Sequence, residues 1–191
     1  MRIIGLSGTN GSGKDTVGEL LAKSHGYLFV SLTDMLRVEA KKRGLSPERE
    51  VLRTISAEWR RGSGLGVLID KALAYYESKG GDTSFSGLVM ASLRNPGEVV
   101  RVHELGGKVI WIDADPRVRY ARISARQRVD DQKSYDQFLS EEQTEMQHSG
   151  DEATLSGQDV KRQADVEFIN EFSSINELEK SLSELIKKLS E

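Results

Sequence analysis

Short apolar runs alternate with helix-like patterns along the whole chain. These runs occupy residues 2–7, 27–30, 88–90, 109–113 and 166–169, and the first of them stops at a glycine. Short continuous apolar runs are typical of strands that are covered by helices on both faces. Because stretches with helical spacing lie between the runs, the pattern predicts an α/β domain with a mostly parallel sheet.

The helices are predicted from apolar spacing and from capping residues. After the first strand, Val17, Leu20 and Leu21 share one helical face. Further helices are expected at 34–43, at 46–61 with Ser46 as N-cap and Pro47 at the first position, at 65–79, after Asn95-Pro96, at 116–126 after Asp115, at 134–147, and behind a Ser174/Glu177 capping box near the end. The polar segment 126–164 has few large apolar residues, so we interpret it as a helical lid over a site.

Composition narrows the class of protein. The chain has 191 residues with a net charge of −3, which corresponds to a single domain spanning 1–191 and argues against a nucleic-acid polymer as partner. The absence of cysteine excludes disulfides, thiol catalysis and cysteine-ligated metals. No apolar run reaches the about 18 residues of a membrane-spanning helix, and the first residues do not resemble a signal peptide. We therefore expect a cytoplasmic protein without a membrane partner.

A glycine-rich segment between the first strand and the first helix carries the strongest chemical signal. Its spacing is that of a Walker A phosphate-binding loop, or P-loop, whose backbone N–H groups and lysine bind the phosphates of a nucleotide. A turn that merely joins the strand to the helix would not require this combination of glycines and lysine. The predicted ATP-binding residues here are Gly8, Asn10, Gly11, Ser12, Gly13, Lys14, Asp15 and Thr16.

The P-loop departs from the strict pattern at one position. Asp15 follows the lysine where a serine or threonine normally binds Mg²⁺, and Thr16 is expected near the α-phosphate. We therefore predict Mg²⁺ with ATP as the cofactor, held by Asp15 through water. A GTPase is disfavoured because the guanine-reading Asn-Lys-x-Asp pattern is absent, and the chain is short for an AAA-type ATPase with a helical lid domain. A kinase of small molecules is left as the favoured class.

The segment SLTDMLR at 31–37 resembles the nucleoside monophosphate kinases, adenylate kinases among them. The resemblance implies that residues 32–80 form a monophosphate-binding helical arm, and it extends to EWRRGSGLG at 58–66 and to SLRNPGEV at 92–99. The latter segment is similar to dephospho-CoA-kinase-like and deoxynucleoside monophosphate kinase proteins. Acceptor-binding residues implied in this way are Ser31, Asp34, Arg37, Arg60 and Arg94.

The same resemblance implies roles for residues later in the chain. Arg122 and Arg126 are four residues apart, hence on one helix face, and in the family such arginines close over the transferring phosphoryl group together with the start of the lid, here Arg128. Lys14 and Arg94 complete the implied catalytic set. Asn170 lies where the family's loop surrounds the adenine of ATP, with backbone contacts more important than its side chain. Asp113 ends its strand like a Walker B acid, but we interpret it as helix-capping.

Together with these patterns, the resemblance implies a three-layer P-loop NTPase fold with a five-stranded parallel sheet in the order 2-3-1-4-5. The predicted reaction transfers the γ-phosphoryl group of ATP to a small phosphorylated acceptor, a ribo- or deoxyribonucleoside monophosphate. Many relatives carry an Asp where this chain has Ala91, and an acceptor that is already anionic needs no such base. Dephospho-CoA kinase is the alternative acceptor class. A nucleotide-binding regulatory or assembly ATPase is the alternative of another kind, and no oligomeric state is predicted.

Overall fold

The central feature of the computed structural model, which describes residues 1–126, 132–147 and 150–189, is one sheet of five parallel strands. The strand order β2-β3-β1-β4-β5 confirms the predicted 2-3-1-4-5. Each strand lies where the apolar runs placed it, with one residue added at five of the ten strand ends. The strands are β1 (Arg2–Gly8), β2 (Tyr27–Ser31), β3 (Gly87–Ala91), β4 (Lys108–Asp113) and β5 (Val166–Ile169).

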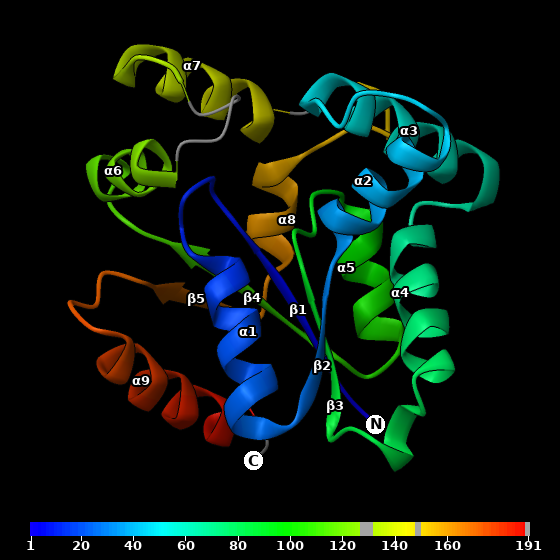
Figure 1. Ribbon diagram of the computed structural model, residues 1–191, viewed down its shortest axis with the longest axis vertical. Helices are drawn as coiled ribbons and strands as arrows, with labels where there is room; N and C mark the ends of the chain where they lie inside the picture. Colours follow the sequence, from blue (N-terminus) through cyan, green and yellow to red (C-terminus); the bar gives the residue numbers. More distant parts are fainter. Residues whose placement is uncertain (127–131, 148–149, 190–191) are drawn as a thin grey trace.

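Helices cover both faces of the sheet, which makes the three predicted layers (Figure 1). The layer with α1 (Lys14–His25) also contains α9 (Ile175–Lys188), and both share a core cluster with Leu6 and Ile112 of the sheet. The helices that contact the other face or build the upper edge are α2 (Leu32–Lys42), α3 (Arg49–Ser63), α4 (Val67–Ser78), α5 (Pro96–Glu104), α6 (Pro116–Arg126), α7 (Tyr135–Met146) and α8 (Gly157–Gln163), with a 3₁₀ turn η1 (Gly81–Thr83) before β3.

Alternation along the buried strands explains why two cores form. In β3, Val89 belongs to the core under α1 and α9, whereas Leu88 and Met90 belong to the core on the opposite face. Successive side chains of a strand point to opposite faces, so a strand that is apolar throughout supplies both cores at once. All five residues of β3 are buried. The continuous apolar runs in the sequence are the direct consequence of this double burial.

Two local predictions need correction, and one helix was not predicted. The helix expected from Ser46 begins at Arg49, with Glu48 at the N-cap, because Ser46 donates its hydroxyl proton to Glu48 (3.0 Å) instead of capping the helix. The capping box at α9 is only half formed: Ser174 accepts from the Glu177 N–H, but the Glu177 carboxylate binds the N–H of Ser173. The polar composition of 126–164 also gave no sign of α8.

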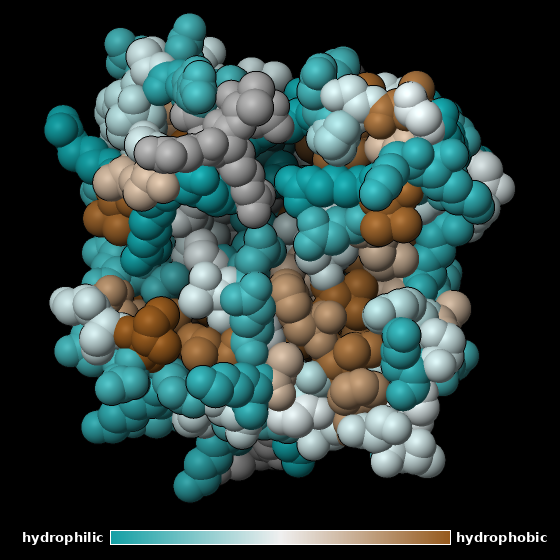
Figure 2. Space-filling model, in the orientation of Figure 1, coloured by the Kyte–Doolittle hydropathy of each residue, from teal (hydrophilic) through white to brown (hydrophobic). Residues whose placement is uncertain are grey.

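The segment interpreted as a lid contains two helices with different surroundings. The helix α8 packs against α5 and β1, and its Val160 is fully buried in the core. The helix α7 lies at the upper edge beyond α6, and α3 lies across from it (Figure 1). Hydrophilic side chains predominate along this edge (Figure 2). The division of the chain into arm and lid stays a prediction.

No helix in the described ranges is long and apolar enough to cross a membrane.

Candidate functional site

The P-loop joins β1 to α1 at the carboxyl edge of the sheet. Three of its residues, Gly8, Gly11 and Gly13, have φ values of 143°, 82° and 87°, which L side chains rarely adopt. A Cβ at Gly8 would overlap the carbonyl oxygen of Ile112 in the neighbouring strand β4. Lys14 opens α1 and turns back, so that its Nζ donates to the carbonyl of Thr9 (3.0 Å). The loop therefore needs its glycines both for backbone conformation and for close approach to the sheet.

Two side chains from distant parts of the sequence hold the P-loop in place. The Thr9 hydroxyl donates to Oδ1 of Asp113 (2.7 Å), at the end of β4, and the side-chain amide of Asn170 donates to the carbonyl of Ser12 (2.8 Å). Asp113 is thus a P-loop partner and not the helix cap that we expected. That cap is Asp115, which accepts from the Arg117 N–H (2.8 Å). Asn170 was expected to act through its backbone, but its buried side chain makes the contact.

The P-loop lysine is buried and lies near another positive charge. Burial, followed by the nearby positive charge of Arg94, lowers the pKa of Lys14 to about 8. An anion bound beside Lys14 would favour its charged form. In the described part of the chain, the buried Ser12 hydroxyl and Oδ1 of Asp15 have no hydrogen-bond partner. Buried polar atoms without partners are uncommon in folded proteins, and both of these belong to the P-loop segment.

The strand next to β1 delivers Arg94 to the opposite side of the site. After β3, Ser92 has a φ of 74°, the one positive φ at a non-glycine residue in the described ranges, and both Ser92 and Leu93 donate their N–H groups to the carbonyl of Leu6. The N–H of Arg94 then donates to Glu98 (2.7 Å), which also completes a capping box with Asn95 at the start of α5. The backbone around Arg94 is therefore fixed on both sides, and strain at Ser92 coincides with the functional edge.

Lys14 and Arg94 face one cavity of about 120 Å³ that is also lined by residues of α2, α3 and α7. Its polar lining is strongly basic, as expected for a site that binds an anion. The basic side chains that line it are Lys14, Arg37, Arg49, Arg53, Arg60, Arg94 and Arg126, and the acids are Asp15 and Glu145. The negative net charge of the whole chain therefore coexists with a local cluster of positive charge.

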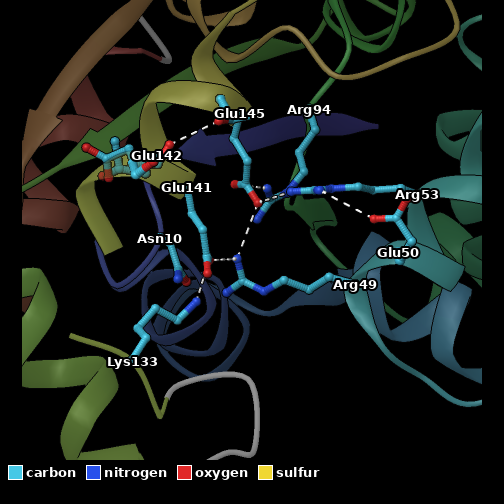
Figure 3. A network of polar contacts seen from close by, with 12 residues as sticks. Asn10, Arg49, Glu50, Arg53, Arg94, Lys133, Glu141, Glu142 and Glu145 are labelled. Atoms are coloured by element: carbon cyan, nitrogen blue, oxygen red, sulfur yellow. Dashed lines mark hydrogen bonds and ion pairs between the residues drawn. The ribbon is translucent and has the colours of Figure 1, made fainter. Parts of the chain in front are cut away.

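A carboxylate from α7 lies at the centre of the arginine cluster (Figure 3). Glu145 accepts hydrogen bonds from Arg94 (2.6 Å) and from Arg53 (2.8 Å) and Arg49 (3.3 Å), the last two on α3. Its side chain is 13% exposed. Burial alone would raise the pKa of Glu145, but Arg94 and Arg49 outweigh burial and lower it to about 2. Glu145 is therefore ionised under all ordinary conditions and is held as an anion by three guanidinium groups.

The predicted acceptor residues have different surroundings. Arg37 lines the cavity and pairs with Asp34 (2.6 Å) one turn away. The Ser31 hydroxyl caps α2 by accepting from the Asp34 N–H (3.3 Å). Arg60 touches the cavity, but its guanidinium is buried against Glu98 (2.6 Å) and also donates to the Ala153 carbonyl (3.0 Å). The structure therefore gives Arg60 a place in a buried ion pair, and its acceptor role stays a prediction.

The arginines predicted on α6 are also separated. Arg126 lines the cavity, whereas Nη1 of Arg122 is buried without a hydrogen-bond partner in the described part of the chain. Arg128 lies outside the described residues. The sequence reasoning missed Arg119, which is nearly buried and donates to Glu142 of α7 (2.9 Å) and to the P-loop carbonyl of Asn10 (3.4 Å). It also missed Arg49, Arg53 and Glu145.

A local signal existed for some of the missed residues. Arg49, Arg53 and Arg60 recur at helical spacing, as Arg119, Arg122 and Arg126 do, and each set places several guanidiniums near one face. Which of them reaches a ligand depends on where the acids of α7 come to lie, and the spacing of arginines in the sequence carries no information on that position.

Trp59 packs against the core and is absent from the cavity lining. No group of three or more potential ligand side chains forms a metal site in the described ranges.

Comparisons with known proteins agree with this architecture. A family model described as AAA domain matches residues 4–148. A UPF0200 protein of Pyrobaculum aerophilum is 31% identical over 99% of both chains, and one of Pyrococcus abyssi is 34% identical over 75% of this chain and 78% of its own. Among solved structures, shikimate kinase from Bacteroides thetaiotaomicron aligns with a TM-score of 0.62 at 18% identity over 99% of this chain and 98% of its own. Shikimate kinase from Aquifex aeolicus aligns with a TM-score of 0.56 at 19% identity, covering 100% and 98%.

Proposed function

The chain belongs to the AAA domain family and to the UPF0200 group, its fold is that of P-loop kinases, and from this premise we propose that it is an ATP-dependent phosphotransferase for a small anionic acceptor. One observation carries the proposal: Lys14 of the P-loop and the arginines Arg37 and Arg94 line the same cavity. A nucleotide-binding regulator needs the P-loop but has no use for a second cationic wall facing it. A kinase needs both, because donor and acceptor phosphates repel each other until positive charge lies between them.

The acceptor that we propose is a ribo- or deoxyribonucleoside monophosphate. Arg37 and Arg94 supply guanidinium groups, whose fork geometry matches phosphate oxygens. Ala91, at the end of β3, offers no carboxylate to deprotonate a hydroxyl. A phosphate oxygen is already an anionic nucleophile, so its attack requires no base. Dephospho-CoA, whose acceptor is a hydroxyl, would depend on Asp15 instead and remains the second acceptor to test.

Each residue contributes position or charge in this mechanism. The P-loop N–H groups and Lys14 would bind the donor phosphates, Arg94 would lie between donor and acceptor, and Arg126 would approach the transferring group from α6. Asp113 and Asn170 would keep the P-loop in its binding shape through Thr9 and Ser12. The partnerless oxygen of Asp15 fits a role in holding Mg²⁺ through water. When bound, Mg²⁺ neutralises charge on the β- and γ-phosphates.

The proposal is tested by a coupled assay of ATP consumption over ribo- and deoxyribonucleoside monophosphates and dephospho-CoA, with shikimate as a control for the fold alone. We expect acceptor-dependent turnover with at least one nucleoside monophosphate. Arg37→Gln and Arg94→Gln should then raise the KM for the acceptor and lower kcat, while ATP binding persists. If ATP binds but no acceptor accelerates its consumption, and neither variant changes the rate, the protein is not a kinase of this class.

A further inference from the structure

The position of Glu145 raises the question of what the three arginines around it are for. Arg49 and Arg53 lie one turn apart on α3, Arg94 lies on the loop after β3, and all three point at the one carboxylate (Figure 3). Arg53 and Arg94 are 41 residues apart in sequence, and a third element, α7, supplies the acid. An ion pair that served only to attach α7 would need a single arginine.

The other charges near this cluster are weaker partners. Glu141 lies 3.6 Å from Arg49 and also pairs with Lys133, and Glu50 lies 3.9 Å from Arg53 on the outer side of α3 with an exposed side chain. Glu145 is the one nearly buried acid that contacts all three guanidiniums among the described residues. Its single negative charge faces three positive charges. Glu145 is therefore the anion at the centre of the cluster whose place a ligand could take.

We propose that Arg49, Arg53 and Arg94 form a binding site for a dianionic group of the acceptor, and that Glu145 occupies this site until such a ligand displaces it. The inference rests on the proposed function in taking Arg94 as an acceptor contact. It adds Arg49 and Arg53 as ligand-binding residues and assigns to Glu145 the place of the ligand's anion. Acceptor binding then requires Glu145 to leave the cluster, which moves the end of α7.

The competition explains why the ligand is a dianion. Glu145 is attached to the same chain, so it is present at a high effective concentration, and a free monoanionic carboxylate gains nothing over it. A phosphate dianion brings a second charge and a third acceptor oxygen, so that each guanidinium has an oxygen of its own. Internal competition of this kind rejects monoanionic ligands without a steric barrier.

The test measures anion binding with the P-loop already filled. Full-length protein is saturated with Mg²⁺ and a non-hydrolysable ATP analogue, and inorganic phosphate or acetate is titrated at pH 8 and constant ionic strength by calorimetry. In Glu145→Gln, we expect phosphate to bind at least about tenfold more tightly than in the unmodified protein, because the internal competitor is gone. Acetate should bind the unmodified protein at least about tenfold more weakly than phosphate.

Glu142→Gln is the matched control. Glu142 lies on the same helix and pairs with Arg119, so the variant loosens α7 without emptying the arginine cluster, and phosphate affinity should stay unchanged. In the double variant that combines Glu145→Gln with Arg53→Gln, the gain in phosphate affinity should be lost. Equal tightening in both single variants, no tightening in Glu145→Gln, or equal binding of acetate and phosphate would each overturn the proposal.

Hydrogen exchange of the unmodified protein gives a second readout that does not depend on a variant folding. Phosphate, but not acetate, should speed amide exchange in α7, and unchanged exchange would overturn the proposal. Failure of the two proposals can be told apart. If no acceptor supports turnover but Glu145→Gln still tightens phosphate through Arg53, the anion site stands and the kinase assignment falls. If turnover is found without that tightening, the kinase stands and Glu145 only attaches α7.

Discussion

The P-loop is held by its own backbone and by hydrogen bonds with two short side chains, whereas the arginines that face it are held by ion pairs between long side chains. Asp113 and Asn170 each reach the loop through one short hydrogen bond, and three glycines set its path. Across the cavity, Arg49 and Arg53 reach from α3, and their main partner Glu145 belongs to another helix. The P-loop side is held rigid by its backbone, whereas the arginine side depends on ion pairs whose acid a ligand can replace.

The contrast indicates a division of labour between the two sides. A donor site that binds the same triphosphate in every cycle profits from being preorganised, because little has to be rearranged when the ligand arrives. An acceptor site that must open and close is better built from side-chain ion pairs, which exchange partners without refolding the backbone. The two sides should therefore respond differently to substitution.

The largest effect is expected at Lys14. Lys14→Met removes the charged donor at the phosphates while leaving a side chain of similar length, and phosphoryl transfer should fall by about a hundredfold to a thousandfold, since one such contact in a water-poor site has that magnitude. The measurement is kcat in the ATP-consumption assay. Lys23→Met, on the exposed face of the same helix, is the control and should be neutral. Comparable losses in both variants would remove the special role of the P-loop lysine.

The next effect concerns stability and separates two kinds of ion pair. Glu98 is fully buried and binds Arg60 and the N–H of Arg94, so Glu98→Gln leaves a buried guanidinium without its counter-charge and should cost about 3–5 kcal/mol of unfolding free energy. Asp70→Asn breaks the Arg101 pair at the surface and should cost less than about 1 kcal/mol. Urea unfolding of the two variants measures both values, and similar costs would contradict the distinction.

Acid should weaken the Glu145 cluster over a defined range of pH. The pKa of Glu145 is lowered from 4.5 to about 2 in the folded protein, so its contribution to stability is complete above about pH 4.5 and is lost as the pH falls towards 2. The difference in unfolding free energy between the unmodified protein and Glu145→Gln should therefore shrink over this range. Unfolding curves at several pH values check this, and a difference that is independent of pH would show that the carboxylate is not held as an anion.

The smallest effect is expected at Ser92, where the backbone joins the two sides. Its φ of 74° favours glycine, so Ser92→Gly relieves backbone strain in the folded protein but adds conformational freedom to the unfolded chain. The free energy of unfolding should therefore rise by no more than about 1 kcal/mol. Ser84→Gly, at a residue with a φ of −112°, is the control and should not raise the melting temperature. A destabilised Ser92→Gly would mean that the serine side chain matters more than its backbone.

Local patterns in the sequence predicted the strands and the P-loop because each depends on neighbouring residues, whereas the order of the strands was implied by the resemblance to a known family. The strand β3 is apolar throughout because both of its faces are buried, and Lys14 follows glycines because phosphate binding needs them there. Where prediction failed, the partner was distant. Thr9 and Asp113 are 104 residues apart, and Ser12 and Asn170 are 158 apart. No periodicity connects residues at such separations.

The arginines show the same limit on the acceptor side. The resemblance selected Arg37, Arg60 and Arg94 as acceptor-binding residues, yet Arg60 is buried against Glu98. Arg49 and Arg53, which the sequence did not single out, line the cavity instead. All of these residues carry the same charge, so sequence alone does not rank them. The ranking comes from which carboxylate each one meets, and that is decided by the packing of α3, α5 and α7.

The sequence by itself determined the parallel sheet, the phosphate-binding loop and the presence of many arginines, because hydrophobic periodicity and backbone conformation are properties of short segments. Only the tertiary structure decided which arginines are committed to buried pairs and which converge on Glu145. Those pairings are set by distances of a few ångströms between elements that are far apart in the chain, and the energy of a charge depends on its surroundings and not on its neighbours in sequence.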